Sequence, residues 1–385
     1  MKLRNGSPEE AGISEQRIAA LDAFADRMFA ENITPAQAYV AARKGVIVAH
    51  RAVGKLTPEA DSPPLDVNAL FPLCSITKIF TAAAIMILVE NGLIGLNRPV
   101  ADYIPEFQGE GKDAVRVHHL LTHTSGIRPE DLWEYKRKVA AEAVIPPCEE
   151  NENPEIHREI YLGCGVPLAR KPGEVMAYLG FGYELLGDIV RRISGLSYPE
   201  FMKRNLFEPL GMKDTFYNVP HSERYRIVRR SPEDACAGWL ENDSCIESES
   251  AGGGLYSTAM DVAIFAQMFL NQGEYDGKRI LSPVSVREMT RNHIPGVASE
   301  YRDEYFPEAY WGYGWSINGT KKDGGDLFSP EAYSHWGAAG VFVAVDPVCD
   351  VVSVYFTVER DLQKPFKNMY TDHFNNVLLA AIEKL

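Results

Sequence analysis

A buried helix is predicted by the stretch Phe71-Pro72-Leu73-Cys74-Ser75-Ile76-Thr77-Lys78 together with the apolar run that follows it from Ile79 to Val89. Residues at positions i and i+3 share one face of a helix, so we expect the Lys78 amine beside the Ser75 hydroxyl. A free lysine, with a pKa of about 10.4, is almost always charged at neutral pH, and a free hydroxyl is a weak nucleophile. Burial and the positive end of the helix dipole both favour the neutral amine. The pair therefore predicts a serine nucleophile beside a lysine base.

The context of this Ser-x-x-Lys pattern matters, because the pattern alone can occur by chance in a chain of 385 residues. Ser75 is the only serine in the chain that is followed by lysine at the third position. The helix behind it carries no charge until Glu90 and closes at Asn91-Gly92, which is a C-cap signal. Its first turn also supplies unpaired backbone N–H groups that can stabilise an oxyanion.

Several segments of the chain carry a family resemblance. Phe71 to Lys78 resembles the nucleophile motif of the serine β-lactamase and penicillin-binding-protein superfamily. Further segments resemble its class C β-lactamase-like branch, which includes D-peptidases and family VIII carboxylesterases. They occur in one colinear order: Leu120 to Ile127, Lys171-Pro172-Gly173-Glu174 leading to Tyr178, Leu185-Leu186-Gly187, Ala251 to Thr258, Tyr313-Gly314-Trp315, His335-Trp336-Gly337 and Val345-Asp346-Pro347. The resemblance implies a serine hydrolase that works through an acyl-enzyme.

The resemblance also implies the remaining site residues. Tyr178 takes the place of the catalytic phenol, which the sequence alone could not select among eighteen tyrosines. Tyr183 is the nearest rival, but it matches the aromatic residue of the following helix. We expect Tyr178 and Lys78 to share a proton and to titrate as a coupled pair. The backbone N–H groups of Ser75 and Ala338 correspond to the oxyanion hole.

The chain departs from the family pattern at two places. The usual Tyr-x-Asn is Tyr178-Leu179-Gly180 here, so the side-chain amide that would hold a substrate amide carbonyl is missing. The usual Lys-Thr-Gly is His335-Trp336-Gly337, so a permanent cation is replaced by a histidine that we expect to be charged only below about pH 6.5. His335, Trp336 and Gly337 are predicted to line the substrate site, and Gly337 permits close backbone approach. Both departures disfavour amides and anionic lactams relative to neutral esters.

Composition limits the class of protein. The formal net charge of -14 argues against nucleic acid or an anionic membrane surface as a partner. The N-terminus lacks the apolar core of an export signal, and the run from Ile79 to Val89 is about half of the roughly 20 residues that span a membrane. We therefore expect a cytoplasmic protein that acts on a small molecule. The sequence leaves the oligomeric state open.

No cofactor is predicted. His119 and His123 form an i, i+4 pair, but no zinc motif with a glutamate accompanies them. The six cysteines show no metal spacing or tight pairing, and Cys74 is expected to pack rather than react. The glycines at 252–254 lack the lysine of a phosphate loop.

The first part of the chain predicts an amphipathic helix from Ile13 to Glu31, begun at Ser14, and a β hairpin from Ala38 to Ala52 that turns at Lys44-Gly45. The pattern from Ser75 to about Tyr217 is mostly helical. Later elements are a helix from Met260 to Leu270 capped by Thr258, β-rich runs at Gly312 to Ile317, Ala332 to Trp336, Val341 to Val345 and Val351 to Val358, and a closing helix from Thr371 to Leu385.

The predicted fold is α/β (α+β), with an antiparallel sheet flanked by N- and C-terminal helices and an inserted, mostly helical domain; the family resemblance implies the same fold. We expect residues 1–74 and 225–385 to form the sheet domain and residues 75–224 the helical domain, with the active site in the cleft between them.

The favoured function is that of a carboxylesterase acting on small acyl esters, with Ser75 as the nucleophile and with Lys78 and Tyr178 relaying its proton. Three alternatives stay open: a D-amino-acid peptidase, amidase or β-lactamase that uses the same residues, an acyltransferase, and a non-catalytic scaffold on the same fold. The intact set of Ser75, Lys78 and Tyr178 argues against the scaffold.

Overall fold

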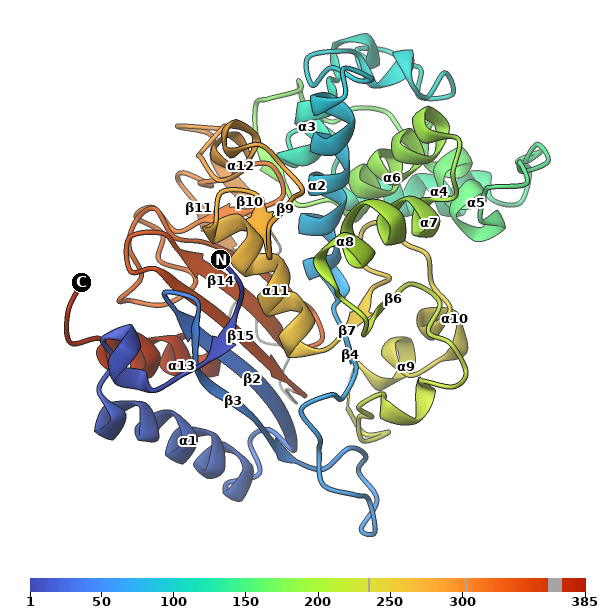
Figure 1. The fold of residues 1–385 in the computed structure, drawn as a ribbon. Helices are drawn as coiled ribbons and strands as arrows, with labels where there is room; N and C mark the ends of the chain where they lie inside the picture. Colours follow the sequence, from blue (N-terminus) through green and yellow to red (C-terminus); the bar gives the residue numbers. More distant parts are fainter. Residues whose placement is uncertain (235, 302–303, 359–368) are drawn as a thin grey trace.

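A seven-stranded sheet forms one part of the molecule, beside a group of helices (Figure 1). The computed structural model describes residues 1–385 except 235, 302–303 and 359–368. The spatial order of the strands is β1-β3-β2-β15-β14-β13-β12, and all neighbours are antiparallel apart from β1 and β3. The strands are β1 (Arg4–Asn5), β2 (Ala36–Arg43), β3 (Val46–Gly54), β12 (Ser316–Ile317), β13 (Tyr333–Gly337), β14 (Val341–Asp346) and β15 (Val351–Thr357). The two ends of the chain meet where β2 pairs with β15, so the predicted fold class is confirmed.

Helices cover both faces of this sheet. Figure 1 shows α1 (Glu15–Ala30) and α13 (Met369–Ala380) on one face and α11 (Ala259–Leu270) on the other. All eight residues of β2 are buried as a result. The predicted caps are present, because the Ser14 side chain accepts from the Arg17 amide and the Thr258 side chain accepts from the Asp261 amide.

Two predicted elements are shorter than expected. The closing helix ends at Ala380, because the following residues leave the helix and Ile382 bridges to Ile13. The run from Gly312 to Ile317 contributes only the two residues of β12 to the sheet. Its first part is a tight turn in which the Gly312 amide donates to the Trp315 carbonyl and Gly314 has a φ of 84°.

The helical part of the molecule packs around α2 (Thr77–Glu90) and α6 (Gly180–Ser194), which contact each other directly. Figure 1 shows it beside the sheet. The other helices here are α3 (Val117–Leu121), α4 (Pro129–Val139), α5 (Pro154–Gly163), α7 (Tyr198–Met202) and α8 (Glu208–Leu210). Among the described residues, none of the helices is both long and apolar enough to cross a membrane. The division of the chain into 1–74 with 225–385 and 75–224 stays a prediction.

Short elements connect the two parts. The strand β4 (Phe71–Pro72) leads into Ser75 and pairs with β7 (Tyr256–Ser257), which in turn pairs with β6 (Thr215–Phe216). The remaining elements are α9 (Ala237–Leu240), α10 (Asp243–Ile246), α12 (Pro283–Met289), the hairpin of β8 (Glu274–Tyr275) with β9 (Lys278–Arg279), and a small sheet of β5 (Met176–Ala177), β10 (Ser299–Tyr301) and β11 (Glu304–Phe306). The segment just before Ser75 is thereby fixed against residues 255–257.

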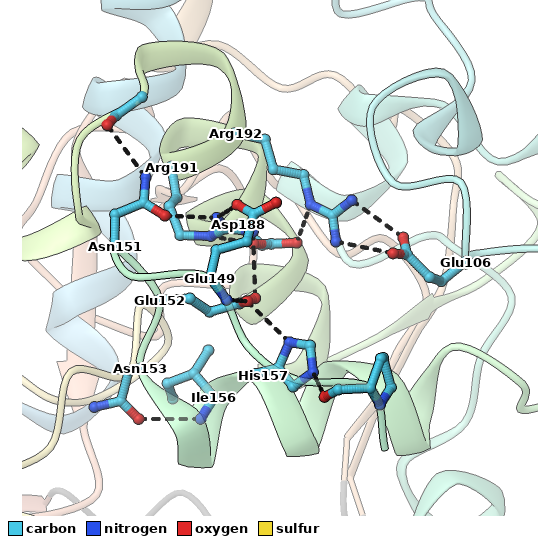
Figure 2. A network of polar contacts seen from close by, with 12 residues as sticks. Glu106, Glu149, Asn151, Glu152, Asn153, Ile156, His157, Asp188, Arg191 and Arg192 are labelled. Carbon is cyan, nitrogen blue, oxygen red and sulfur yellow. Dashed lines mark hydrogen bonds and ion pairs between the residues drawn. The ribbon is translucent and has the colours of Figure 1, made fainter. Parts of the chain in front are cut away.

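A network of ion pairs ties α6 to the loop that precedes α5 (Figure 2). Asp188 accepts from Arg191 Nε at 2.8 Å and from Arg192 Nε at 2.7 Å. Arg191 also contacts Glu149 at 2.6 Å and Glu152 at 3.2 Å. The side chains of Asp188, Arg191 and Glu152 are at most 6% exposed. These contacts hold α6 in place behind the segment that carries Ser75 and Lys78.

Candidate active site

The structure brings Ser75 and Lys78 together. Ser75 lies in a single 3₁₀ turn, Cys74–Ile76, and α2 begins directly after it at Thr77. Lys78 Nζ lies 3.1 Å from Ser75 Oγ and 2.5 Å from the carbonyl oxygen of Gly252. The lysine is only 2% exposed. The expected hydroxyl–amine contact is therefore present, and the Gly252 carbonyl is an additional partner.

The environment of Lys78 favours a base. Burial lowers the pKa of Lys78 to about 8, and the attraction of Glu184 only partly opposes this shift. Its position in the first turn of α2 adds the repulsion of the helix dipole. A neutral amine in this place can donate to the Gly252 carbonyl and accept the proton of Ser75.

Cys74 precedes Ser75 in a strained conformation. Its φ of 46° is unusual for a residue with a Cβ. Its side chain is buried in a cluster with Cys236, Leu240 and Ala339, and its sulfur accepts from the Ala339 amide. Burial raises the pKa of Cys74 to about 12, so the thiol stays protonated at neutral pH, as a packing role requires.

Two tyrosine rings flank the amine of Lys78. Lys78 Nζ lies 5.2 Å from the ring centroid of Tyr178 and 5.6 Å from that of Tyr183. Tyr183 is fully buried, and its hydroxyl donates to the Leu121 carbonyl at 3.0 Å. Tyr178 follows β5, and its ring lies 4.3 Å from that of His123. Of the two hydroxyls, that of Tyr183 serves the backbone, which leaves Tyr178 as the candidate phenol.

The end of β13 approaches the segment before Ser75. A Cβ at Gly337 would lie 2.2 Å from the Leu73 carbonyl oxygen, so only glycine fits here. Ala338 follows directly and packs against the cluster that contains Cys74, the residue before Ser75. The Trp336 ring stacks on Tyr178 with centroids 6.0 Å apart. The three residues 336–338 thus meet the residues of the helical part.

The expectation that His335 becomes a cation below about pH 6.5 is wrong. Its side chain is fully buried, and Nδ1 contacts the Trp336 carbonyl at 2.8 Å. Burial, together with repulsion from Lys78 and Lys321, lowers the pKa of His335 to about 3. The ring is therefore neutral at any ordinary working pH, and no charged partner for a carboxylate arises at this position.

Lys321 is a buried cation near the site that sequence reasoning missed. Its Nζ lies 3.0 Å from the Ala309 carbonyl, 2.5 Å from Ser316 Oγ and 3.0 Å from Asp323 Oδ2. These partners use all three of its N–H donors. Lys321 therefore does not replace the missing lysine of the family motif as a binding group.

Glu184 is a second missed residue. Its carboxylate accepts from Ser250 Oγ at 2.5 Å and from the amides of Ala251 and Gly252, both at 3.1 Å. It is the only charged residue between Gly180 and Gly187, and this isolated charge in an apolar stretch is the signal that could have found it.

The histidines do not form a metal site. Among the described residues, no group of three or more histidine, cysteine, aspartate or glutamate side chains could hold a metal ion. His119 Nδ1 accepts from the Arg116 amide, and His123 Nδ1 accepts from the Leu179 amide. The second of these bonds fixes Leu179, the residue that follows Tyr178.

Comparisons with known proteins identify the family and the fold. The sequence model of the Beta-lactamase family matches residues 21–372. A protein of Salmonella agona (strain SL483) named "Putative D-alanyl-D-alanine carboxypeptidase" is 25% identical, and the match covers 90% of this chain and 83% of that protein. Among solved structures, EstCE1, described as a hydrolase with promiscuous acyltransferase activity, has a TM-score of 0.75 and 17% identity, and the match covers 94% of this chain and 99% of that chain. A family VIII carboxylesterase has a TM-score of 0.73 and 22% identity, over 96% of this chain and 98% of that chain.

A serine beside a buried lysine at the start of a core helix, next to an antiparallel sheet, is the arrangement of the serine β-lactamase and penicillin-binding-protein class. The chain belongs to the Beta-lactamase family of that class, whose members are serine hydrolases. The predicted family is therefore confirmed.

Proposed function

We propose that this protein is a carboxylesterase that cleaves small acyl esters through a covalent intermediate on Ser75. The observation that carries the proposal is the 3.1 Å contact between Ser75 Oγ and the buried amine of Lys78, whose pKa burial lowers to about 8. Near that pH a large share of the amine is neutral and can accept the serine proton.

In the proposed reaction, Ser75 Oγ attacks the ester carbonyl carbon while its proton passes to Lys78 Nζ. The backbone N–H groups of Ser75 and Ala338 stabilise the resulting oxyanion. The intermediate collapses, the bond to the alcohol oxygen breaks, and the leaving alkoxide takes a proton from Lys78 or Tyr178. Water then attacks the acyl-enzyme by the same steps and releases the acid.

The preference for esters over amides or lactams is inferred from the residues at positions 335 and 180, where the family motifs have a lysine and an asparagine. Penicillins and C-terminal peptides present a carboxylate, and burying it without a cation costs several kcal/mol. Burial and the repulsion of nearby lysines keep the pKa of His335 near 3, and Lys321 has its own partners. A Cβ at Gly180 would meet open space, so the amide donor of the family motif is replaced by room for a larger group.

A substrate panel tests the proposal. We expect kcat/KM for p-nitrophenyl butyrate to exceed that for a chromogenic cephalosporin by at least about 10²-fold at neutral pH, which corresponds to about 2.7 kcal/mol. Comparable values would put the β-lactamase or peptidase function first. Ester product formed in place of acid when an alcohol is added would instead indicate an acyltransferase.

A fluorophosphonate probe separates the enzyme from a non-catalytic scaffold. We expect the wild type to be labelled and Ser75→Ala to remain unlabelled, with roughly 10³-fold or more lower kcat for the ester. Equal melting temperatures of the two proteins serve as the control for folding. Turnover by Ser75→Ala near that of the wild type would refute the proposal.

A further inference from the structure

The carboxylate of Glu184 is enclosed by donors from one turn of the chain. Its Oε1 accepts from Ser250 Oγ and from the Gly252 amide, and its Oε2 accepts from the Ala251 amide. Both oxygens thus have hydrogen-bond partners, and the two backbone N–H groups among them favour the ionised form of the carboxyl group. Glu184 therefore fixes the turn Ser250 to Gly252 from the side of α6.

The same turn is held from the opposite side by α2. The Gly252 carbonyl accepts from Lys78 Nζ at 2.5 Å, and the Ala251 carbonyl accepts from Thr81 Oγ1 at 2.6 Å. The N–H groups of residues 251 and 252 thus face Glu184 and their carbonyl groups face α2. The turn therefore connects the Glu184 carboxylate to the Lys78 amine through hydrogen bonds on both of its sides.

The two charged groups lie on either side of Gly252, to which both are hydrogen-bonded. A Cβ at Gly252 would lie 2.9 Å from Glu184 Oε1 and 3.7 Å from Lys78 Nζ, so no side chain separates them. Burial lowers the pKa of Lys78, and the charge of Glu184 is the largest effect that raises it. Burial in turn raises the pKa of Glu184, against the pull of its donors and of Lys78.

Other titratable groups surround Lys78 and Glu184. Facing Lys78 are the Cys74 thiol, His123, Tyr178, Tyr183 and His335. Behind Glu184 lie Tyr198, Tyr217 and a cavity of about 30 Å³ whose further charged lining residues are Glu152, Asp188, Arg191 and Glu249.

The carboxylates of that lining have partners of their own. Asp188 and Glu152 bind Arg191, and Glu249 accepts a hydrogen bond from the side chain of Asn153. Glu184 is thus the carboxylate of this group that acts on Lys78.

We propose that Glu184 is a positioning residue for the Lys78 base. Its carboxylate fixes the turn Ser250 to Gly252, so that the Gly252 carbonyl holds the amine against Ser75, and it supplies the negative charge that this amine faces. The inference rests on the proposed function, because it assigns the residue that sets the strength of the base in that reaction.

Loss of the carboxylate changes the basicity of the amine. A buried lysine without a counter-charge can have a pKa as low as about 5–6. We expect Glu184→Gln to move the midpoint of Ser75 reactivity to lower pH by at least about one unit. The weaker base should also lower the plateau rate by about 10-fold or more.

The experiment measures the rate constant of Ser75 labelling by a fluorophosphonate between pH 5.5 and 10. The wild type is compared with Glu184→Gln and with the matched control Glu249→Gln, which removes a carboxylate from the same cavity. We expect the midpoint to move in Glu184→Gln and to stay in place in the control. Melting temperatures report on folding.

Glu184→Asp keeps the charge but withdraws it by one methylene from the turn. We expect it to retain the wild-type midpoint and to react about 10-fold more slowly, because the Gly252 carbonyl loses its support. The inference would be overturned if Glu184→Asp reacted as fast as the wild type, or if the midpoint of Glu184→Gln were unchanged. In either case, labelling of the wild type would leave the proposed function intact. An unlabelled wild type would overturn both.

Discussion

Glu184 and Asp188 lie one turn apart on α6, and their surroundings are opposite. Asp188 lies between two arginine side chains that donate to it at 2.7 and 2.8 Å, as Figure 2 shows. Glu184 accepts only from neutral donors and faces an amine whose pKa burial lowers to about 8. One turn of α6 therefore separates Asp188, which is paired with two permanent cations, from Glu184, which faces a single amine that can lose its proton.

The difference shows how one helix serves two purposes. Arginine keeps its proton at any working pH, so Arg191 and Arg192 stay cationic and their ion pairs with Asp188 hold the fold. The amine of Lys78 can lose its proton, because burial and the helix dipole offset the single carboxylate that faces it. A fixed pair gives structure, whereas a pair near its titration midpoint gives chemistry.

The largest effect is expected when the titratable amine of Lys78 is replaced by a permanent cation. Lys78→Arg places a permanent cation opposite Glu184, and guanidinium stays charged above about pH 12, so it cannot take the serine proton. We expect kcat/KM for p-nitrophenyl butyrate to fall by roughly 10³-fold. Substantial turnover with an unchanged pH profile would mean that Lys78 acts as a positioning charge and not as a base.

The converse change breaks the paired centre. Asp188→Asn leaves two arginines without their shared carboxylate, whose side chain is 2% exposed. We expect a loss of about 3 kcal/mol in the free energy of unfolding, measured by urea denaturation, with no shift in the pH midpoint of activity. Glu134→Gln, which breaks the exposed pair with Lys138, is the control and should leave stability unchanged. A shifted midpoint in Asp188→Asn would show that the two centres are coupled.

The activity of the wild type is expected to depend on pH through the titration of Lys78. Burial lowers the pKa of Lys78 to about 8, and only the neutral amine is a base. We therefore expect kcat/KM to rise with pH, with a midpoint near 8, and to fall about tenfold for each unit below the midpoint. Circular dichroism at each pH would separate titration from unfolding. A flat profile between pH 6 and 9 would exclude Lys78 as the titrating base.

The buried His335 is expected to make the free energy of unfolding depend on pH. Burial lowers its pKa to about 3 in the folded protein, whereas the unfolded value is about 6.5. Between these values the unfolded chain binds a proton that the folded protein does not, so stability falls as pH drops, by up to about 1.4 kcal/mol per unit. We expect His335→Gln to remove that part of the slope. If the free energy of unfolding changed equally with pH in the wild type and in His335→Gln, the lowered pKa of His335 would be refuted.

Local patterns predicted the elements that depend on neighbouring residues. The i, i+3 spacing predicted the contact of Ser75 with Lys78, and the side chains of Ser14 and Thr258 predicted two helix starts. Alternating and β-rich runs predicted β2, β3, β13, β14 and β15 within a few residues. Tyr178 was identified through family resemblance, because nothing local distinguishes it from the other tyrosines.

The family and the fold class could be recognised from the sequence alone, and Ser75 and Lys78 could be predicted as nucleophile and base, because these inferences follow from short spacings and from the order of motifs. The protonation states were decided by the tertiary structure. Glu184 meets Ser250 to Gly252 across more than sixty residues of chain, and Lys321 reaches the surroundings of His335 from a loop. Burial and the distance between charges set the pKa of a group, and both exist only once distant segments have packed together.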